Sequence, residues 1–309
     1  MSKILVTGGA GFIGSHLVEA LIAKGHEVIV LDNLSNGNKL PPSIRNKIKL
    51  VIDDVRNRDV VLNCAEGCEQ IFHFAAILGV DIVADRPSDT MIVESMGMQN
   101  VVHAALKHGV KKIIYASTSG IYGHSAIDET MNEEVHVDPR TSYAIAKRFN
   151  EIFLKTQHEE NELESVSIRF FNVYGPRQDA RMVISKFFEQ GIKNNSITIY
   201  GTGNQTRDFT YIDDAIKATI LLSEKVKGCE IVNIANEKEL TIKELALKIK
   251  ELTKSSSELV FLEVTKKRYD YEIERRLGCS KKLLALTGYK PGTNVDKGLK
   301  ETYEFFKKT

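Results

Sequence analysis

The amino-acid sequence predicts an α/β protein with a doubly wound parallel sheet (Rossmann-type) and a smaller mixed C-terminal lobe. Short apolar runs alternate with longer helical patterns through the first half of the chain, and these runs carry apolar residues on both faces. This alternation is typical of parallel strands that are covered by helices on either side. The 309 residues, 42% of them hydrophobic, supply enough apolar surface for a large core in two lobes.

Six runs in the first half have the length and composition of buried strands. They span residues 4–7, 28–31, 49–52, 71–74, 112–116 and 167–170. Helical spacing covers residues 13–24, 89–108 and 142–160. We expect residues 1–171 to form the first domain, with strands and helices in this order.

The pattern changes after Tyr174-Gly175-Pro176. Helical stretches at 183–190, 213–223, 241–253 and 295–307 are now separated by short strands at 197–200 and 231–234. The longest irregular segment, 263–279, is rich in charge and tyrosine. We expect residues 172–309 to form a lobe over the carboxyl ends of the strands, where α/β sheets bind ligands. Parts near residues 205–235 are expected to pack back on the first domain.

Charge and cysteine usage exclude several classes of function. Lys plus Arg number 42 against 41 for Asp plus Glu, so neither nucleic acid nor an anionic membrane is an expected partner. Local basic pairs such as Arg275-Arg276 are expected on solvated faces. No apolar run reaches the roughly 20 residues of a membrane span. The four scattered cysteines indicate reduced thiols in a cytoplasmic protein, and neither they nor the histidines have metal-ligand spacing, so no metal is expected.

A glycine cluster, TGGAGFIG, follows the first strand and opens the first helix. Gly8, Gly11 and Gly14 leave room for a pyrophosphate to approach the backbone, and the helix N-terminus adds N–H donors. Asp32 ends the second strand, about 20 residues further on, where a carboxylate accepts hydrogen bonds from ribose hydroxyls. The alternative is a tight turn that only packs. Because Asp32 would repel a 2′-phosphate, the spacing favours NAD over NADP.

Asp54, at the end of the third strand, has two possible roles. It could accept a hydrogen bond from the adenine amino group, or it could cap the following helix. The sequence leaves both open.

A tyrosine–lysine pair provides candidate catalytic groups. Tyr143 and Lys147 are four residues apart in SYAIAK, so they share one face of the predicted helix. A nearby ammonium stabilises a phenolate and makes tyrosine a usable acid–base group. Thr118, in YASTSGIYG at the end of the preceding strand, offers a hydroxyl to a substrate oxygen. The spacing alone is common in helices.

The ordered set of motifs resembles the extended short-chain dehydrogenases/reductases, and within them the nucleotide-sugar epimerase and dehydratase family. TGGAGFIG, HFAA at residues 73–76, the Ser/Thr strand end, YxxxK and RFFNVYGPRQ at residues 169–178 carry this resemblance. It implies bound NAD, with Thr118, Tyr143 and Lys147 as catalytic residues. The implied cofactor-binding residues are Gly8, Gly11, Phe12, Ile13, Gly14, Asp32, Asn33, Asn36, Gly37, Asp54, Val55, Phe74, Ala75, Ala76, Tyr143 and Lys147.

The resemblance also implies a nucleoside-diphosphate sugar as substrate. Its implied ligands are Thr118, Asn172, Tyr200, Arg207 and Arg268. Two arginines suit a diphosphate because each donates a planar pair of charged hydrogen bonds. The alternative for Arg268 is a solvated basic face, since the sequence around it, KKRYDYEIERR, departs from the family pattern.

Two small residues point to the reaction. Family dehydratases carry an Asp-Glu pair after the catalytic threonine, and the related decarboxylases carry a glutamate at the second position; here the residues are Ser119 and Gly120. The remaining groups suffice for oxidation and reduction at one carbon, which predicts a 4-epimerase acting through a 4-keto sugar. A 4-dehydrogenase, a multi-step epimerase and a 4,6-dehydratase remain alternatives, as does a non-catalytic NAD-binding sensor or scaffold.

Three residues depart from the family pattern. Glu94 stands where the family usually has asparagine, Met98 replaces a threonine, and Ser185 replaces a frequent proline. A buried glutamate at position 94 would alter the electrostatics near the nicotinamide or act as an extra base. The helical stretches 89–108 and 142–160 resemble those of the family's dimer interface, which implies a homodimer.

Overall fold

The structure, a computed structural model, describes residues 1–124, 129–264 and 273–308. At its centre lies a seven-stranded sheet in the order β11-β6-β5-β4-β1-β2-β3, with every neighbouring pair parallel. The strands are β1 (Lys3–Thr7), β2 (Glu27–Asp32), β3 (Ile48–Ile52), β4 (Gln70–His73), β5 (Lys112–Thr118), β6 (Glu164–Phe170) and β11 (Cys229–Ile234). The doubly wound parallel sheet expected from the sequence is confirmed.

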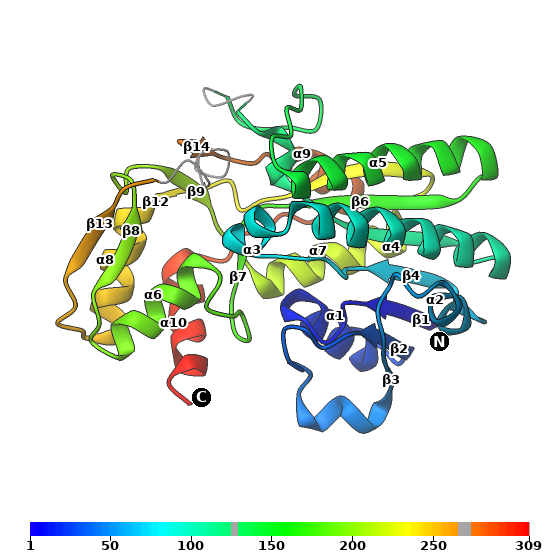
Figure 1. The fold of residues 1–309 in the computed structure, drawn as a ribbon, viewed down its shortest axis with the longest axis horizontal. Helices are drawn as coiled ribbons and strands as arrows, with labels where there is room; N and C mark the ends of the chain where they lie inside the picture. The colour runs from blue at the N-terminus through cyan, green and yellow to red at the C-terminus, as the bar shows by residue number, and fades with distance from the viewer. Residues whose placement is uncertain (125–128, 265–272, 309) are drawn as a thin grey trace.

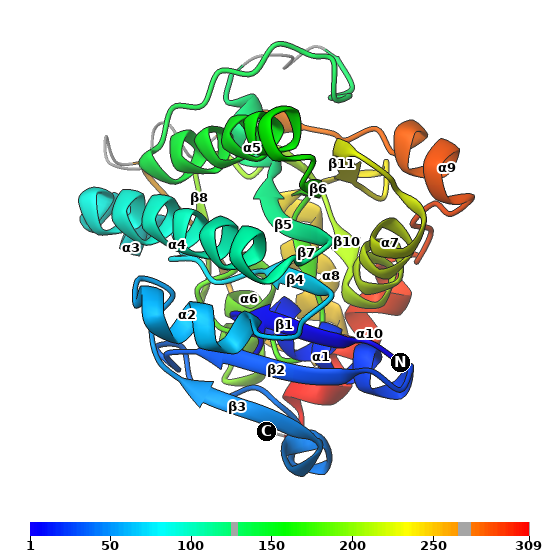
Figure 2. The ribbon, with the colours of Figure 1, turned by 90° about the vertical axis from the view of Figure 1, so that its right-hand side faces the viewer.

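Helices cover both faces of this sheet (Figure 2). One layer holds α2 (Arg58–Ala65), α4 (Pro87–His108) and α5 (Ser142–Asn161), and the other holds α1 (Phe12–Ala23) and α7 (Ile212–Lys225). Alternation along β1 explains the two layers, since Ile4 and Val6 join one buried cluster and Leu5 joins the other. The strands are therefore apolar on both sides.

Most of the second half of the chain forms the smaller lobe on the left of Figure 1. It contains α6 (Val183–Ile192), α8 (Ile242–Thr253), α10 (Val295–Phe306), the parallel pair β8 (Ile197–Tyr200) with β13 (Leu259–Leu262), and a small sheet of β12 (Glu239–Thr241), β9 (Thr206–Asp208) and β14 (Arg275–Arg276). In sequence, β11 and α7 belong to this half, but β11 completes the central sheet and α7 packs against α1. The domain boundary near residue 171 stays a prediction.

Short elements complete the chain, and the sequence patterns did not reveal them. They are η1 (Pro42–Lys47), α3 (Val80–Asp85), η2 (Ser119–Tyr122), the paired β7 (Val173–Tyr174) and β10 (Thr210–Tyr211), and α9 (Lys281–Thr287). Among the helices of the described residues, none is both long and apolar enough to cross a membrane.

Strand order creates a crevice at the carboxyl ends of the central strands. From β1 the chain continues to β2 on one side, while β4 pairs with β1 on the other side. The crossovers therefore diverge next to β1, and ligands bind at such switch points outside the carboxyl ends of the strands. His16 on α1 also contacts the loop after β7, where two guanidinium nitrogens of Arg177 lie 3.1 and 2.6 Å from its ring nitrogens. This contact ties the first helix to the second half of the chain.

Candidate active site

One large cavity, of about 810 Å³, lies at this crevice between the sheet and the smaller lobe. Every described residue that the sequence analysis assigned to a site lines it, and the individual roles of these residues stay predictions. Arg268 lies outside the described residues. The cavity thus brings together predicted site residues from positions 8 to 207.

The glycine turn leaves no space for side chains. Gly8 has φ +70°, and a Cβ there would lie 2.5 Å from the backbone nitrogen of Ala75. A Cβ on Gly14 would lie 2.1 Å from the carbonyl oxygen of Gly8. The bare backbone therefore lets β1 turn directly into α1, whose first residues line the cavity and carry the N–H donors of a helix N-terminus. This cradle fits a pyrophosphate.

Asp32 is held at the end of β2 by backbone donors. Its carboxylate accepts hydrogen bonds from the backbone nitrogens of Ala10 at 2.9 Å and Leu34 at 2.8 Å. Burial raises the pKa of Asp32 above its usual range, and these two hydrogen bonds oppose the shift. The carboxylate lines the cavity where the ribose of a dinucleotide would lie.

Asp54 is not a helix cap. The N-cap of α2 is Asn57, whose side chain accepts from the nitrogen of Val60. Asp54 instead pairs with Arg56 at 2.8 and 2.9 Å and accepts from the Asn33 amide at 3.0 Å. The hydrogen bond from the Arg56 side chain is the main reason that the pKa of Asp54 falls to about 2. The carboxylate stays charged at the cavity edge, and its role toward adenine stays a prediction.

The candidate catalytic residues come from β5 and α5. Thr118 ends β5, and its hydroxyl accepts from the nitrogen of Gly120 at 3.0 Å. Thr141 caps α5 by accepting from the nitrogen of Ala144, which places Tyr143 in the first turn and Lys147 one turn later. A buried hydrogen bond, which the Ser117 hydroxyl on β5 donates to the Glu151 carboxylate on α5 at 2.6 Å, joins the two elements.

Lys147 is paired with an acid that the sequence did not place. Its Nζ atom lies 3.0 Å from Oε2 of Glu94 on α4, and both side chains have no exposed surface. Glu94 therefore lies behind the lysine, which itself lines the cavity. Contrary to the expectation of a lysine-lowered phenol, burial and the charge of Glu94 raise the pKa of Tyr143. Glu94 therefore affects the Tyr143 phenol, whereas its effect near the nicotinamide stays a prediction.

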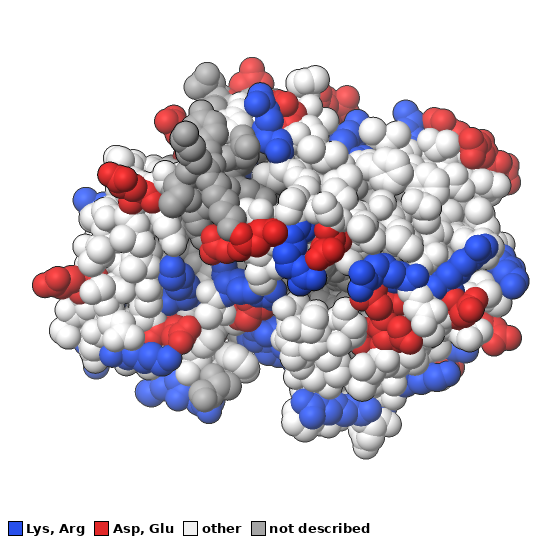
Figure 3. Space-filling view, in the orientation of Figure 1, with Lys and Arg blue, Asp and Glu red and all other residues white. Residues whose placement is uncertain are grey.

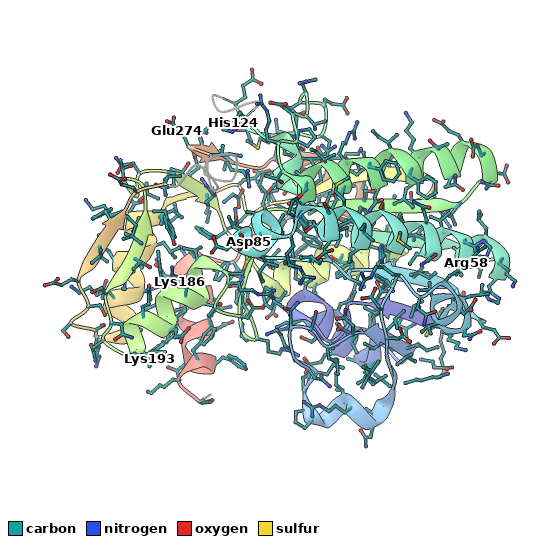
Figure 4. All side chains as sticks on the ribbon, in the orientation of Figure 1. Arg58, Asp85, His124, Lys186, Lys193 and Glu274 are labelled. Atoms are coloured by element: carbon teal, nitrogen blue, oxygen red, sulfur yellow. The ribbon has the colours of Figure 1, made fainter. Side chains whose placement is uncertain are left out.

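The opposite end of the cavity carries basic side chains. Arg207 is held by the carbonyl oxygens of Thr206 at 2.8 Å and Ile273 at 2.5 Å. Lys186 of α6, labelled in Figure 4, has its Nζ atom 5.3 Å from the centre of the Tyr200 ring, and both residues line the cavity. Asn172 also lines it and donates to the carbonyl of Asp208 at 3.0 Å. The four residues form a basic, polar wall.

Arg276 joins this wall, contrary to the expectation of a solvated basic pair. In the parallel pairing of β14 with β9 it stands opposite Arg207, and both line the cavity. Its neighbour Arg275 instead pairs with Glu239 at 2.8 Å. Strand alternation directs the two arginines to opposite faces of β14. Only the pairing of β14 with β9 reveals that Arg276 belongs to the cavity wall.

Other surface features set limits on ligands. On the face shown in Figure 3, basic and acidic side chains are interspersed rather than gathered in one field. No group of His, Cys, Asp or Glu among residues 1–124, 129–264 and 273–308 has the arrangement of a metal site. The four cysteines, Cys64, Cys68, Cys229 and Cys279, are free thiols.

The fold and cavity define a dinucleotide-binding enzyme class, and comparisons with known proteins identify the family. Residues 4–235 match the model of the NAD dependent epimerase/dehydratase family. The chain belongs to this family of NAD-dependent enzymes, and NAD is its cofactor. The glycine cradle, Asp32 and the cavity fit that group.

Relatives match along the whole chain but differ in activity. The chain is 36% identical to UDP-N-acetyl-alpha-D-glucosaminuronate decarboxylase from Bacillus cytotoxicus, over 99% of this chain and 98% of the relative. The crystal structure of UDP-glucose 4-epimerase with UDP-glucose from Thermotoga maritima has a TM-score of 0.93 and 32% identity, covering 99% of both chains. The UDP-glucose 4-epimerase complex with NAD from Thermus thermophilus has a TM-score of 0.91 and 30% identity, covering 99% of both. Relatives named as dehydratases match as well.

Proposed function

We propose that the protein is an NAD-dependent nucleotide-sugar 4-epimerase that acts through a transient 4-keto sugar. The observation that carries the proposal is the composition of the cavity next to Thr118. Tyr143 and Lys147 are present, but Ser119 and Gly120 occupy the positions where eliminating relatives have acids. A hydroxyl and a hydrogen cannot replace the acid and base that dehydration needs.

The residues of the chain divide the remaining work. Tyr143 accepts the proton of the sugar C4 hydroxyl and returns it, Thr118 donates a hydrogen bond to the same oxygen, and Lys147 holds the nicotinamide ribose. NAD would be held by the glycine turn, Asp32 and Lys147, and it would supply a reversible hydride acceptor for C4. Because the first step leaves a flat ketone, rotation of the sugar before reduction inverts C4. Retention of both Tyr143 and Lys147 supports an enzyme over a non-catalytic sensor.

The basic residues at this end of the cavity support a substrate that carries a nucleoside diphosphate. Arg207 and Arg276 stand side by side on neighbouring strands, so two planar guanidinium groups face one region of the cavity. Such a pair suits the two phosphates of a diphosphate. Lys186 on α6 adds a third cationic side chain to the cavity lining.

A decarboxylase is the second candidate, and the Bacillus relative favours it. Oxidation at C4 of a sugar acid creates a β-keto acid, which loses carbon dioxide without an added acid. Gly120 lacks the glutamate of the related decarboxylases, but dehydration needs both an acid and a base, so Ser119 and Gly120 argue more strongly against dehydration than against decarboxylation. This candidate requires a sugar that carries a C6 carboxylate.

A panel of nucleotide sugars tests the proposal. The purified protein is incubated with UDP-, dTDP-, GDP- and CDP-linked hexoses and with UDP-linked hexuronic acids, and the products are followed by proton NMR. We expect a hexose derivative to reach an equilibrium with its C4 epimer. Loss of carbon dioxide from a hexuronic acid, with no epimerisation of any hexose, would establish the second candidate instead.

We also propose a homodimer that forms through α4 and α5. These helices lie side by side along one flank of the molecule in Figures 1 and 2. Their outer faces expose large apolar side chains, a pattern typical of a helix–helix interface. The exposed residues are Ile92, Met96, Ile145, Phe149 and Ile152. Light scattering of the intact protein tests the dimer, and a Phe149→Glu variant should become monomeric. The cytoplasmic location stays a prediction from the cysteine pattern.

A further inference from the structure

A buried carboxylate lies directly behind the proposed catalytic pair. Oε2 of Glu94 is 3.0 Å from Nζ of Lys147, and neither side chain is exposed. The Tyr115 phenol donates to the same oxygen at 3.3 Å. Asn150 on α5 donates to the Glu94 backbone carbonyl at 3.1 Å and to the Tyr115 oxygen at 2.8 Å. Helix α5 and strand β5 therefore fix the carboxylate from two sides.

The ion pair opposes the loss of charge that burial favours at both residues. Burial lowers the pKa of Lys147, and the charge of Glu94 offsets part of this shift. The opposite holds for Glu94, whose pKa burial raises and Lys147 lowers. An unpaired buried ammonium tends to lose its proton, so the partner carboxylate stabilises the charged lysine.

Glu94 and Lys147 have opposite effects on the ionisation of the Tyr143 phenol. Nζ of Lys147 lies 5.3 Å from the centre of the Tyr143 ring, where its charge favours a phenolate. Glu94, held next to this ammonium, has the opposite sign and disfavours the phenolate. The net field at Tyr143 is consequently weaker than a lone lysine would give.

We propose that Glu94 is a positioning residue, which fixes the Lys147 ammonium through a buried ion pair and offsets its charge at the Tyr143 phenol. The inference rests on the roles given to Tyr143 and Lys147 in the proposed function. It gives this chain a more alkaline range of activity than the asparagine usual in the family would give. Glu94 acts through Lys147 and does not line the cavity itself.

The other ionisable groups around Glu94 do not replace it. His73 on β4 is fully buried, and burial together with Lys147 lowers its pKa to about 3, so it stays neutral in the neutral range. The charge of Glu151 on α5 is neutralised by ion pairs with Arg169 and Arg148, each 2.9 Å away. Tyr115 on β5 has a pKa that burial and Glu94 raise, so it stays protonated. Glu94 is the carboxylate that contacts Lys147.

The test follows ionisation of the Tyr143 phenol in the NAD-loaded protein without sugar. Ultraviolet difference titration is performed on the wild type and on Glu94→Gln, each with its Tyr143→Phe counterpart subtracted. We expect Glu94→Gln to move the titration of Tyr143 downward by about one pH unit. Glu94→Asn, which has the usual family residue, should do the same and serves if the glutamine variant fails to fold.

Two controls separate charge from packing. Glu94→Asp retains the carboxylate and should keep the midpoint near that of the wild type, while Tyr115→Phe removes a hydrogen bond of the cluster but no charge. In turnover, the acid limb of the kcat profile should move with the titration. An unchanged or raised Tyr143 midpoint in both neutral variants would overturn the proposal. Because the titration uses no sugar, failure of every nucleotide sugar to react would contradict the proposed function alone.

Discussion

Arg276 on β14 stands opposite Arg207 on β9, and both arginines line the cavity. They are 69 positions apart in the sequence, and the two short strands alone make them neighbours. The arrangement creates a paired guanidinium site at the end of the cavity remote from the glycine turn. It also gives the described part of the chain a two-arginine site that does not depend on Arg268.

Replacing either arginine should weaken nucleotide binding. Arg207→Ala and Arg276→Ala each remove charged hydrogen bonds to a diphosphate, so we expect roughly 10- to 100-fold weaker binding of UDP. Isothermal titration calorimetry with UDP measures this, with retention of NAD as the check on folding. Arg275→Ala is the matched control, because Arg275 pairs with Glu239 and should leave the affinity unchanged. Equal affinities for the Arg276 and Arg275 variants would remove Arg276 from the site.

Asp32 should set the preference for NAD. Asp32→Asn removes the negative charge and retains an oxygen that can accept from Ala10 or Leu34. We expect the affinity for NADP to rise by roughly tenfold relative to NAD, because repulsion of the 2′-phosphate is relieved. Fluorescence titration of the apoprotein with both dinucleotides measures the ratio. Tighter binding of NADP than of NAD by the unchanged protein would contradict the role of Asp32.

Tyr143→Phe should stop turnover while leaving both ligands bound. The ring still packs, but the proton acceptor is lost, so kcat should fall by roughly 10²- to 10⁴-fold. Steady-state rates and NAD content measure the two effects. Tyr115→Phe is the control, since the Tyr115 ring lies 4.7 Å from Lys147 Nζ yet has no proposed proton transfer. A phenylalanine variant at position 143 with near-normal kcat would show that another group is the base.

Folding stability should decrease below neutral pH because of His16. Burial and Arg177 lower its pKa from 6.5 to about 4, so the unfolded chain takes up a proton before the folded protein does. The stabilising contribution is complete above the unfolded pKa and is lost as the pH falls toward the folded one. Between about pH 7 and about pH 5 we expect His16 to account for about 1–2 kcal/mol of lost unfolding free energy.

Chemical denaturation of wild type and His16→Gln at these two pH values checks this. The glutamine can accept from Arg177 but does not titrate, so its loss of stability should be smaller. His73 has the same sign of shift and is present in both proteins, which isolates the effect of His16. Equal losses in the two proteins would show that the His16 contact does not titrate as expected.

Local patterns predicted the central sheet and the residues at the centre of the candidate site. Gly8, Gly14 and Asp32 lie in one strand–helix–strand unit, so their positions follow from spacing along about 30 residues. Tyr143 and Lys147 share a helix face for the same reason. In each case the geometry is set by a single element or by its immediate neighbours.

Long-range pairing explains what the sequence did not reveal. Arg276 belongs to a two-residue strand that is defined by its pairing with β9, and the segment 263–279 has no periodicity of its own. The Glu94–Lys147 contact joins α4 to α5 over 53 positions, which spacing along either helix cannot predict. The sequence left two roles open for Asp54 because Asn57, the actual cap of α2, is only three residues away and could not be told from it by position.

The fate of a label at C4 tests the proposed reaction most directly. The nucleotide sugar that turns over in the panel is prepared with deuterium at C4, and its product is analysed by mass spectrometry. A 4-epimerase oxidises and reduces the same carbon with the same hydride, so the product should have the mass of the labelled substrate, with the deuterium retained. A product lighter by one water or by one carbon dioxide would contradict the proposal, and so would release of a keto sugar that has lost the label.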